Sequence, residues 1–188
     1  MTPVRSRPAF PYRRPDSPMD IAGLWDAHEA STDRLGPHHS QTLAIAHTLA
    51  ISVWHVGDVQ NAATILNQAV ACLTSSFGTN HPATLAAKGD FAAILFELGR
   101  DADAGSIELE AFQIARAHLG KAHAVTTVLA WNRALNCERY GDLEAAGEIL
   151  RNELTWLLAQ QPSELEEDQN IIRSMLAERL KWDDAPLC

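Results

Sequence analysis

The chain has 188 residues, of which 46% are hydrophobic, and a formal net charge of -9. This length suits one domain with a sizeable buried core. The negative charge argues against nucleic-acid binding, because affinity for nucleic acid comes largely from Lys and Arg that neutralise phosphates. The charge is also uneven: residues 1–18 hold four arginines and one aspartate, a charge of +3 that leaves -12 for the rest. A basic or apolar protein partner therefore fits better.

The ends of the chain and its cysteines bear on location. Residues 1–18 are rich in Pro and Arg, which predicts a disordered tail, and 183–188 form a short C-terminal tail. The sequence contains neither a run of 18 apolar residues, as a membrane span requires, nor a secretory signal pattern. Cys72, Cys137 and Cys188 match no disulfide, zinc or redox spacing, so we expect free thiols in a reducing, cytoplasmic compartment.

Apolar residues recur at helical spacing through the remainder of the chain, as in Leu43, Ala46 and Leu49. They predict eight helices, near 19–34, 39–56, 60–76, 81–98, 101–118, 123–140, 143–159 and 164–182. The predicted fold class is all-α.

The sequence repeats itself every 42 residues. Three units, at about 35–76, 77–118 and 119–160, each begin with a hydrophobic residue and a glycine. Each then has a histidine at its fifth position and a threonine at its eighth: His39 and Thr42, His81 and Thr84, His123 and Thr126. Such periods are typical of arrays of stacked helix pairs, which mostly bind other proteins.

The predicted domain, residues 19–182, includes one helix on either side of the three repeats. The helix at 19–34 aligns with the second helix of a repeat, and the helix at 164–182 has few of the repeat's marks. We interpret both as caps that cover an apolar face which a terminal repeat would otherwise expose.

The residues that recur in every repeat are interpreted as structural. Gly57, Gly99 and Gly141 fall between the two helices of each pair, where a left-handed conformation ends a helix without steric cost. The regular recurrence of the histidines favours a capping or packing role over metal binding. His47 and His55 are a separate case: they lie about two turns apart on one helix, and either sense pH or make ordinary hydrogen bonds.

No catalytic residue, metal site or cofactor is predicted. The sequence lacks the nucleophile-elbow, phosphate-loop, zinc-protease and dinucleotide motifs. Cys72 and Cys137 lie in apolar helical patterns, where cysteine is usually an inert small hydrophobe. We therefore expect a protein that is not an enzyme.

Two segments carry a family resemblance: residues 35–43, Leu-Gly-Pro-His-His-Ser-Gln-Thr-Leu, and residues 77–85, Phe-Gly-Thr-Asn-His-Pro-Ala-Thr-Leu. A weaker copy follows at 119–126. The pattern resembles the tetratricopeptide repeat in its 42-residue form, found in kinesin light chains. The resemblance implies a right-handed α-solenoid of antiparallel helix pairs. The first helix of each pair would line a concave groove that commonly holds a peptide or partner segment.

The resemblance assigns the groove to equivalent positions, here called columns, in the first helix of each of the three repeats. In many relatives one of these columns holds an Asn that bonds a peptide backbone; here it holds Thr48, Asp90 and Asn132. The predicted partner-binding residues are His47, Thr48, Ile51, Trp54, His55, Asp90, Phe96, Glu97, Trp131, Asn132, Leu135, Glu138 and Arg139. Asp90, Glu97 and Glu138 would form an acidic rim. The aromatic side chains either anchor a partner or pack between repeats and under the caps.

The predicted function is protein–protein interaction, with a peptide or partner segment held in the groove of an adaptor, sensor or chaperone. The alternative is an assembly subunit that uses its apolar surface for homodimerisation or for a permanent complex. The basic tail either occupies the groove or is an inert leader. Neither nucleic acid nor a membrane is an expected partner.

Overall fold

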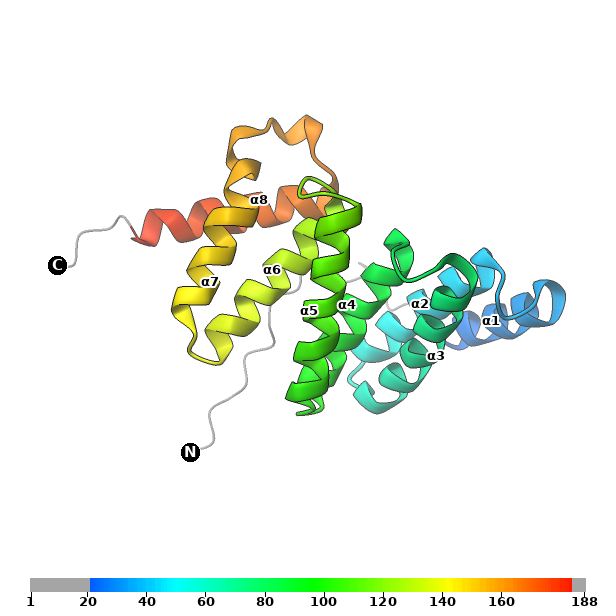
Figure 1. Cartoon of the computed structure of the whole chain (residues 1–188). Helices are drawn as coiled ribbons and strands as arrows, with labels where there is room; N and C mark the ends of the chain where they lie inside the picture. Colours follow the sequence, from blue (N-terminus) through cyan, green and yellow to red (C-terminus); the bar gives the residue numbers. More distant parts are fainter. Residues whose placement is uncertain (1–20, 184–188) are drawn as a thin grey trace. The chain divides into compact units, whose positions relative to one another are not determined.

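The computed structural model describes residues 21–183, with side chains to residue 179, and every regular element in this range is helical (Figure 1). The α-helices are α1 (Ile21–Leu35), α2 (Ser40–His55), α3 (Val59–Phe77), α4 (Pro82–Glu97), α5 (Asp101–His118), α6 (Ala124–Arg139), α7 (Leu143–Ile149) and α8 (Glu167–Asp183). A π-helical turn η1 (Leu150–Leu154) and the 3-10 helices η2 (Thr155–Ala159) and η3 (Pro162–Glu164) complete the set. The predicted tail at 1–18 lies outside the described residues, as does the predicted tail at 183–188 except for Asp183, which ends α8.

The described residues form two compact bodies. The N-terminal body, residues 21–120, contains α1 to α5, and each helix packs on the next along the chain. The C-terminal body, residues 121–183, contains α6, which packs on α7, η1 and α8. The three predicted repeats are thus present as the pairs α2 with α3, α4 with α5, and α6 with α7 and its continuation.

The three recurrent histidines start the first helix of each repeat. His39, His81 and His123 each have extended backbone at the N-cap position, and the ring Nδ1 accepts a hydrogen bond from the backbone N–H two residues later, at 3.2 Å in all three cases. Such a bond satisfies one of the N–H groups that a helix start leaves without an intrahelical partner. The predicted capping role is confirmed.

The turn between the two helices of each repeat depends on glycine. Gly57, Gly99 and Gly141 have φ angles of 95°, 74° and 82°, in the left-handed region that residues with a Cβ rarely adopt. This confirms the turn role predicted for them.

Two glycines test this role: Gly99 in the turn between α4 and α5, and Gly105 inside α5. We expect Gly99→Ala to lower the free energy of unfolding by roughly 1–2 kcal/mol, because its φ of 74° strains any L side chain. Gly105→Ala, inside α5 with nothing within 4 Å of the added Cβ, should raise it by roughly 0.5–1 kcal/mol. Urea denaturation of both variants measures the two effects. Equal effects of the same sign would contradict a conformational role for Gly99.

Predicted and observed helix boundaries agree within three residues except in the second helix of the third repeat. The sequence predicts one helix over 143–159, and this was wrong: α7 ends at Ile149 and continues as η1 and η2. Side chains take two carbonyls that a regular helix would bond to its own N–H groups. Lys121 Nζ donates to the Asn152 oxygen at 2.5 Å, and Thr155 Oγ1 donates to the Arg151 oxygen at 2.8 Å. The Lys121 ammonium, which comes from outside the segment, competes for a carbonyl of η1, whereas a hydroxyl bond like that of Thr155 also occurs within the regular helices α2 and α3.

Candidate functional site

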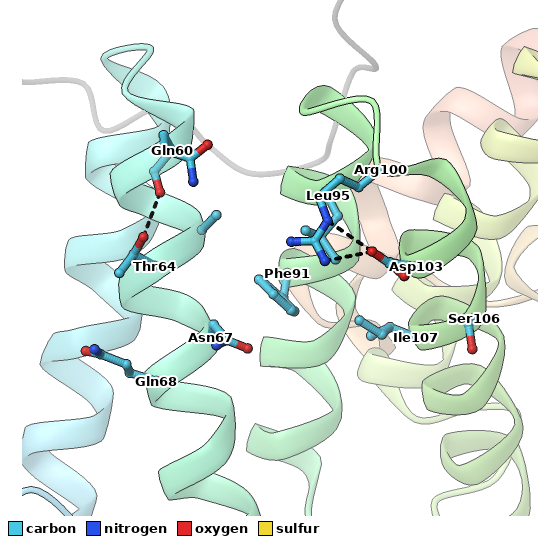
Figure 2. Close-up of a pocket in the computed structure, with 11 residues that line it drawn as sticks. Gln60, Thr64, Asn67, Gln68, Phe91, Leu95, Arg100, Asp103, Ser106 and Ile107 are labelled. Carbon is cyan, nitrogen blue, oxygen red and sulfur yellow. Dashed lines mark hydrogen bonds and ion pairs between the residues drawn. The ribbon is translucent and has the colours of Figure 1, made fainter.

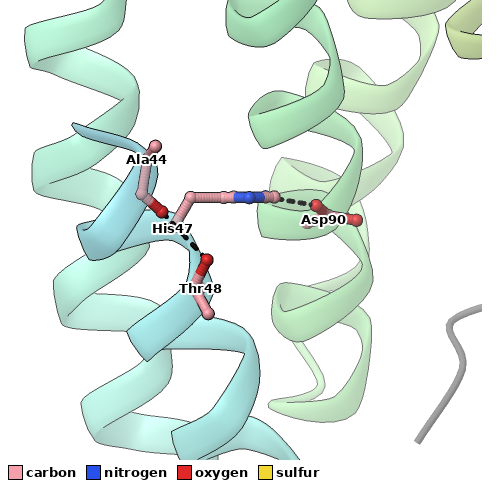
Figure 3. A network of polar contacts seen from close by, with 4 residues as sticks. All are labelled: Ala44, His47, Thr48 and Asp90. Carbon is pink, nitrogen blue, oxygen red and sulfur yellow. Dashed lines mark hydrogen bonds and ion pairs between the residues drawn. The ribbon is translucent and has the colours of Figure 1, made fainter. Parts of the chain in front are cut away.

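The first helices of repeats one and two are joined by a hydrogen bond between two predicted groove residues. His47 on α2 and Asp90 on α4 meet at 2.7 Å, Nε2 to Oδ2 (Figure 3). The Asp90 side chain is 2% exposed and that of His47 is 31% exposed. The pair therefore ties α2 to α4 at a point where the carboxylate is closed to solvent.

A second bond lies two helical turns further along the same helices. Trp54 donates its indole Nε1–H to Glu97 Oε2 at 2.7 Å, and the Trp54 ring stacks on His55 with centroids 6.2 Å apart. Both bonds join residues 43 positions apart, one more than the repeat length of 42. Each bond therefore links a residue of repeat one to the residue that follows its equivalent in repeat two. We call these two bonds the α2–α4 cross-links.

The surroundings of His47 set its protonation. Burial lowers the pKa of the imidazole, but the hydrogen bond and the negative charge of Asp90 outweigh this and hold the pKa above the ordinary value of 6.5. The folded state therefore binds a proton at His47 more tightly than the unfolded chain does.

This shift predicts a pH dependence of stability. We expect the free energy of unfolding of the wild type relative to His47→Gln to be largest below pH 6.5, the ordinary histidine pKa, and to fall as pH rises through the raised pKa. Urea denaturation of both proteins from mildly acidic to mildly alkaline pH measures the difference. A difference that stays flat or grows with pH would contradict the His47–Asp90 contact.

In the C-terminal body, α8 makes the corresponding contacts with α6. Arg179 pairs with Glu138, and its guanidinium lies 5.6 Å from the ring centre of Trp131. Gln169 Nε2 donates to the Ala122 carbonyl at 2.9 Å and to Thr127 Oγ1 at 3.2 Å. The Arg179–Glu138 and Gln169–Thr127 contacts span 41 and 42 residues, close to the 43 of the α2–α4 cross-links. Helix α8 thus packs on α6 as the first helix of a further repeat would, and the sequence did not single out Gln169 or Arg179.

The predicted groove residues divide by exposure. Five are buried: Trp54, Asp90, Phe96, Trp131 and Asn132. Six are half-buried: His47, Ile51, His55, Glu97, Leu135 and Glu138. Two are exposed: Thr48 and Arg139. Of the two roles open to the aromatics, the burial of Trp54, Phe96 and Trp131 favours packing. Each carboxylate of the predicted acidic rim already has a partner within the molecule.

The side chains that could ligate a metal are dispersed in the described part of the chain. Between residues 21 and 179, no three His, Cys, Asp or Glu side chains are grouped as a metal site would need. Cys72 and Cys137 are half-buried and form no disulfide. Among the described helices, none has the length and apolar character needed to cross a membrane.

A pocket of about 540 Å³ opens on the other side of the repeats, between the second helices α3 and α5 (Figure 2). Phe91 and Leu95 of α4 and Ile107 of α5 form its apolar part. Amide and hydroxyl side chains of α3 line one wall, among them Thr64 and Asn67. The family resemblance pointed only to residues of the first helices, and no sequence pattern indicated this pocket.

Comparison with known proteins agrees with this architecture. Residues 41–117 match the family model described as tetratricopeptide repeat. A search of curated proteins gave no match. Among solved structures, the TPR-like repeats of a kinesin light chain-like protein from Podosopora anserina share 21% identity with a TM-score of 0.65, covering 86% of this chain and 82% of that one. A single-substitution variant of the same protein gives 0.66 with the same identity and coverage.

The matched segment runs from the start of α2 to the end of α5 and contains the His81 cap, the Gly57 and Gly99 turns and both α2–α4 cross-links. The predicted all-α solenoid of helix pairs is confirmed. Repeats of this family generally mediate protein–protein interaction and typically serve as scaffolds without catalysis. Residues 41–117 therefore match tetratricopeptide repeats, and the fold is similar to that of the TPR-like repeats of the kinesin light chain-like protein.

Proposed function

We propose that the chain is a non-catalytic interaction module that binds a peptide or partner segment on the face formed by α2 and α4. The observation that carries the proposal is the pair of α2–α4 cross-links, His47 to Asp90 and Trp54 to Glu97, each at 2.7 Å. They hold two neighbouring first helices together by their predicted inner sides. A surface fixed before binding loses less conformational entropy when a partner docks.

The cross-links also determine which side chains are left for a partner. Ala44 and Thr48 are exposed and Ile51 is half-buried, all on α2 beside His47. The Thr48 hydroxyl bonds its own helix, at the Ala44 carbonyl, 3.0 Å away (Figure 3). The contact surface is therefore small and weakly polar. We propose that the partner supplies an apolar or neutral segment, and that the chain acts as an adaptor, sensor or chaperone in the cytoplasm.

Two matched threonine variants test the proposal. Thr48 on α2 and Thr64 on α3 are both exposed, and each bonds the carbonyl four residues earlier at 3.0 Å. Partner proteins captured by the intact chain from the source cells are quantified for the wild type, Thr48→Arg and Thr64→Arg. We expect Thr48→Arg to lose a partner that Thr64→Arg keeps. Equal capture by all three would refute a partner site on α2 and α4.

The assembly alternative is tested on the same proteins. Light scattering after size exclusion gives the mass of the wild-type particle. A dimer that Thr48→Arg converts to a monomer would show that this face binds a second copy of the chain rather than another protein.

A further inference from the structure

The pocket between α3 and α5 is bounded by an unusual helix. Helix α3, residues 59–77, contains no charged residue in a chain with net charge -9. Its outward side chains at the pocket are amides and a hydroxyl, including Gln60, Thr64 and Asn67. Such groups donate and accept hydrogen bonds as a peptide main chain does, and they lose less hydration free energy than charges when covered.

The apolar part of the pocket is shaped by ring and branched side chains. Phe91 and Ile107 are half-buried and pack against buried Leu95, so part of their surface faces the pocket. A neutral segment with aromatic or proline side chains would cover this surface while its main chain meets the amides of α3. Proline-rich segments bind such grooves well because their extended helix is formed before binding.

One end of the pocket is acidic. The α2–α3 and α4–α5 turns lie at the same end of their helices in Figure 1. Asp58 caps α3 there, and Asp101 and Asp103 lie in the first turn of α5, against Arg100. Arg100 bonds Asp103 from Nε at 3.0 Å and from Nη2 at 2.7 Å. Of these, Asp103 and Arg100 line the pocket, while Asp58 and Asp101 lie beside it in the sequence neighbourhood of its lining residues. Three carboxylates against one guanidinium give this neighbourhood a net negative charge that favours a basic group.

We propose that the pocket binds the chain's own N-terminal segment. Residues 8–12, Pro-Ala-Phe-Pro-Tyr, are neutral and carry two aromatic and two proline side chains. Arginines flank them on both sides, at 5 and 7 and at 13 and 14. The neutral centre matches the uncharged wall and the apolar floor, and one arginine pair matches the acidic end. This site is separate from the α2–α4 face and goes beyond the function proposed for that face.

The length of chain before α1 is sufficient for binding within one molecule. Tyr12 lies nine residues before Ile21, where α1 begins. Nine extended residues span about 30 Å. Helices α1 to α5 pack in succession, and neighbouring helices lie roughly 8–10 Å apart, so three such steps come to a similar distance.

Amide spectra of the intact protein test the proposal without any partner. The double variant Phe10→Ser with Tyr12→Ser should shift the backbone amides of Thr64, Asn67 and Ser106 relative to the wild type. The matched control, Pro3→Ser with Val4→Ser, alters the same tail outside the neutral stretch and should leave them in place. Shifts that appear on α2 around Thr48, or no shift at the pocket, would overturn the proposal.

Two further measurements make the result specific. Ser106→Trp fills the pocket. The amides of the tail residues common to both variants should then move from their wild-type positions to those seen in the Phe10→Ser, Tyr12→Ser variant. Unchanged tail amides would overturn the proposal. Serial dilution of the wild type should leave the pocket shifts unchanged, whereas loss of the shifts on dilution would refute binding within one chain and indicate a second copy. Failure of either leaves the α2–α4 proposal untouched, because that proposal is tested by Thr48→Arg.

Discussion

Replacing His47 with Ala is expected to lower the free energy of unfolding by about 3 kcal/mol, the cost of leaving a buried charge without its partner. Asp90 is 1% exposed, and His47 is the group that bonds its carboxylate. Without the imidazole, the carboxylate keeps its desolvation penalty and loses the compensating interaction. Urea denaturation at neutral pH measures the loss.

A second variant shows whether the stranded carboxylate causes the effect. The double variant His47→Ala with Asp90→Ala removes both members of the pair, so we expect it to be more stable than His47→Ala alone. Replacement of a whole buried pair is often close to neutral, whereas removal of one member is costly. A double variant less stable than His47→Ala would contradict the view that the buried charge dominates.

Replacing Trp131 with Ala is expected to cost about 4 kcal/mol, in the range found for fully buried aromatic residues. The Trp131 side chain is 0% exposed, and Arg179 of α8 lies over its ring. Truncation removes the largest fully buried side chain of the described core and leaves a cavity in the C-terminal body. Thermal or urea denaturation, followed by circular dichroism, measures the loss.

Trp25→Ala is the matched control, because that tryptophan is on α1 and is 46% exposed. Its truncation should change stability by less than about 1 kcal/mol. Equal losses for the two variants would show that Trp131 is not a core residue. A Trp131 variant that loses a partner must therefore be shown to fold, because truncation of this buried side chain can abolish binding by unfolding the protein.

Local sequence rules predicted most of the fold. The positions of Gly57 and Gly99 required a left-handed turn, and the structure has one at each. The recurrence of His39 and His81 indicated a capping role, and each ring accepts a backbone N–H at its helix start. These features depend on a few neighbouring residues, which is why a single sequence was sufficient to predict them.

The candidate site was harder to predict because it depends on contacts between repeats. The family resemblance placed His47 and Asp90 in groove columns, but it did not show that the two side chains reach each other across 43 residues. The contact of Lys121 with the Asn152 carbonyl likewise joins residues 31 positions apart, and no local sequence pattern predicts it. Whether a column residue faces a partner or the next helix is decided by packing, not by spacing.

Helix α8 illustrates the same limit. Its sequence has few of the repeat's marks, so it was interpreted as a cap. In the structure it packs on α6 through Gln169 and Arg179, which bond Thr127 and Glu138. Groove residues predicted for repeat three therefore contribute to the packing between α6 and α8. The residues that recur in each repeat form turns and helix caps, whereas the packing of α8 on α6 depends on Gln169 and Arg179, which are not recurrent residues.

We propose that the bonds between polar residues at the inner positions of repeats one and two fix the face that a partner contacts. Hydrogen exchange of the Trp54 indole N–H tests it most directly, because that group donates to Glu97 at 2.7 Å. We predict slow exchange in the wild type and much faster exchange in Glu97→Ala, with the Trp25 indole fast in both. Exchange of the Trp54 indole that is equally fast in the wild type and in Glu97→Ala would contradict the claim.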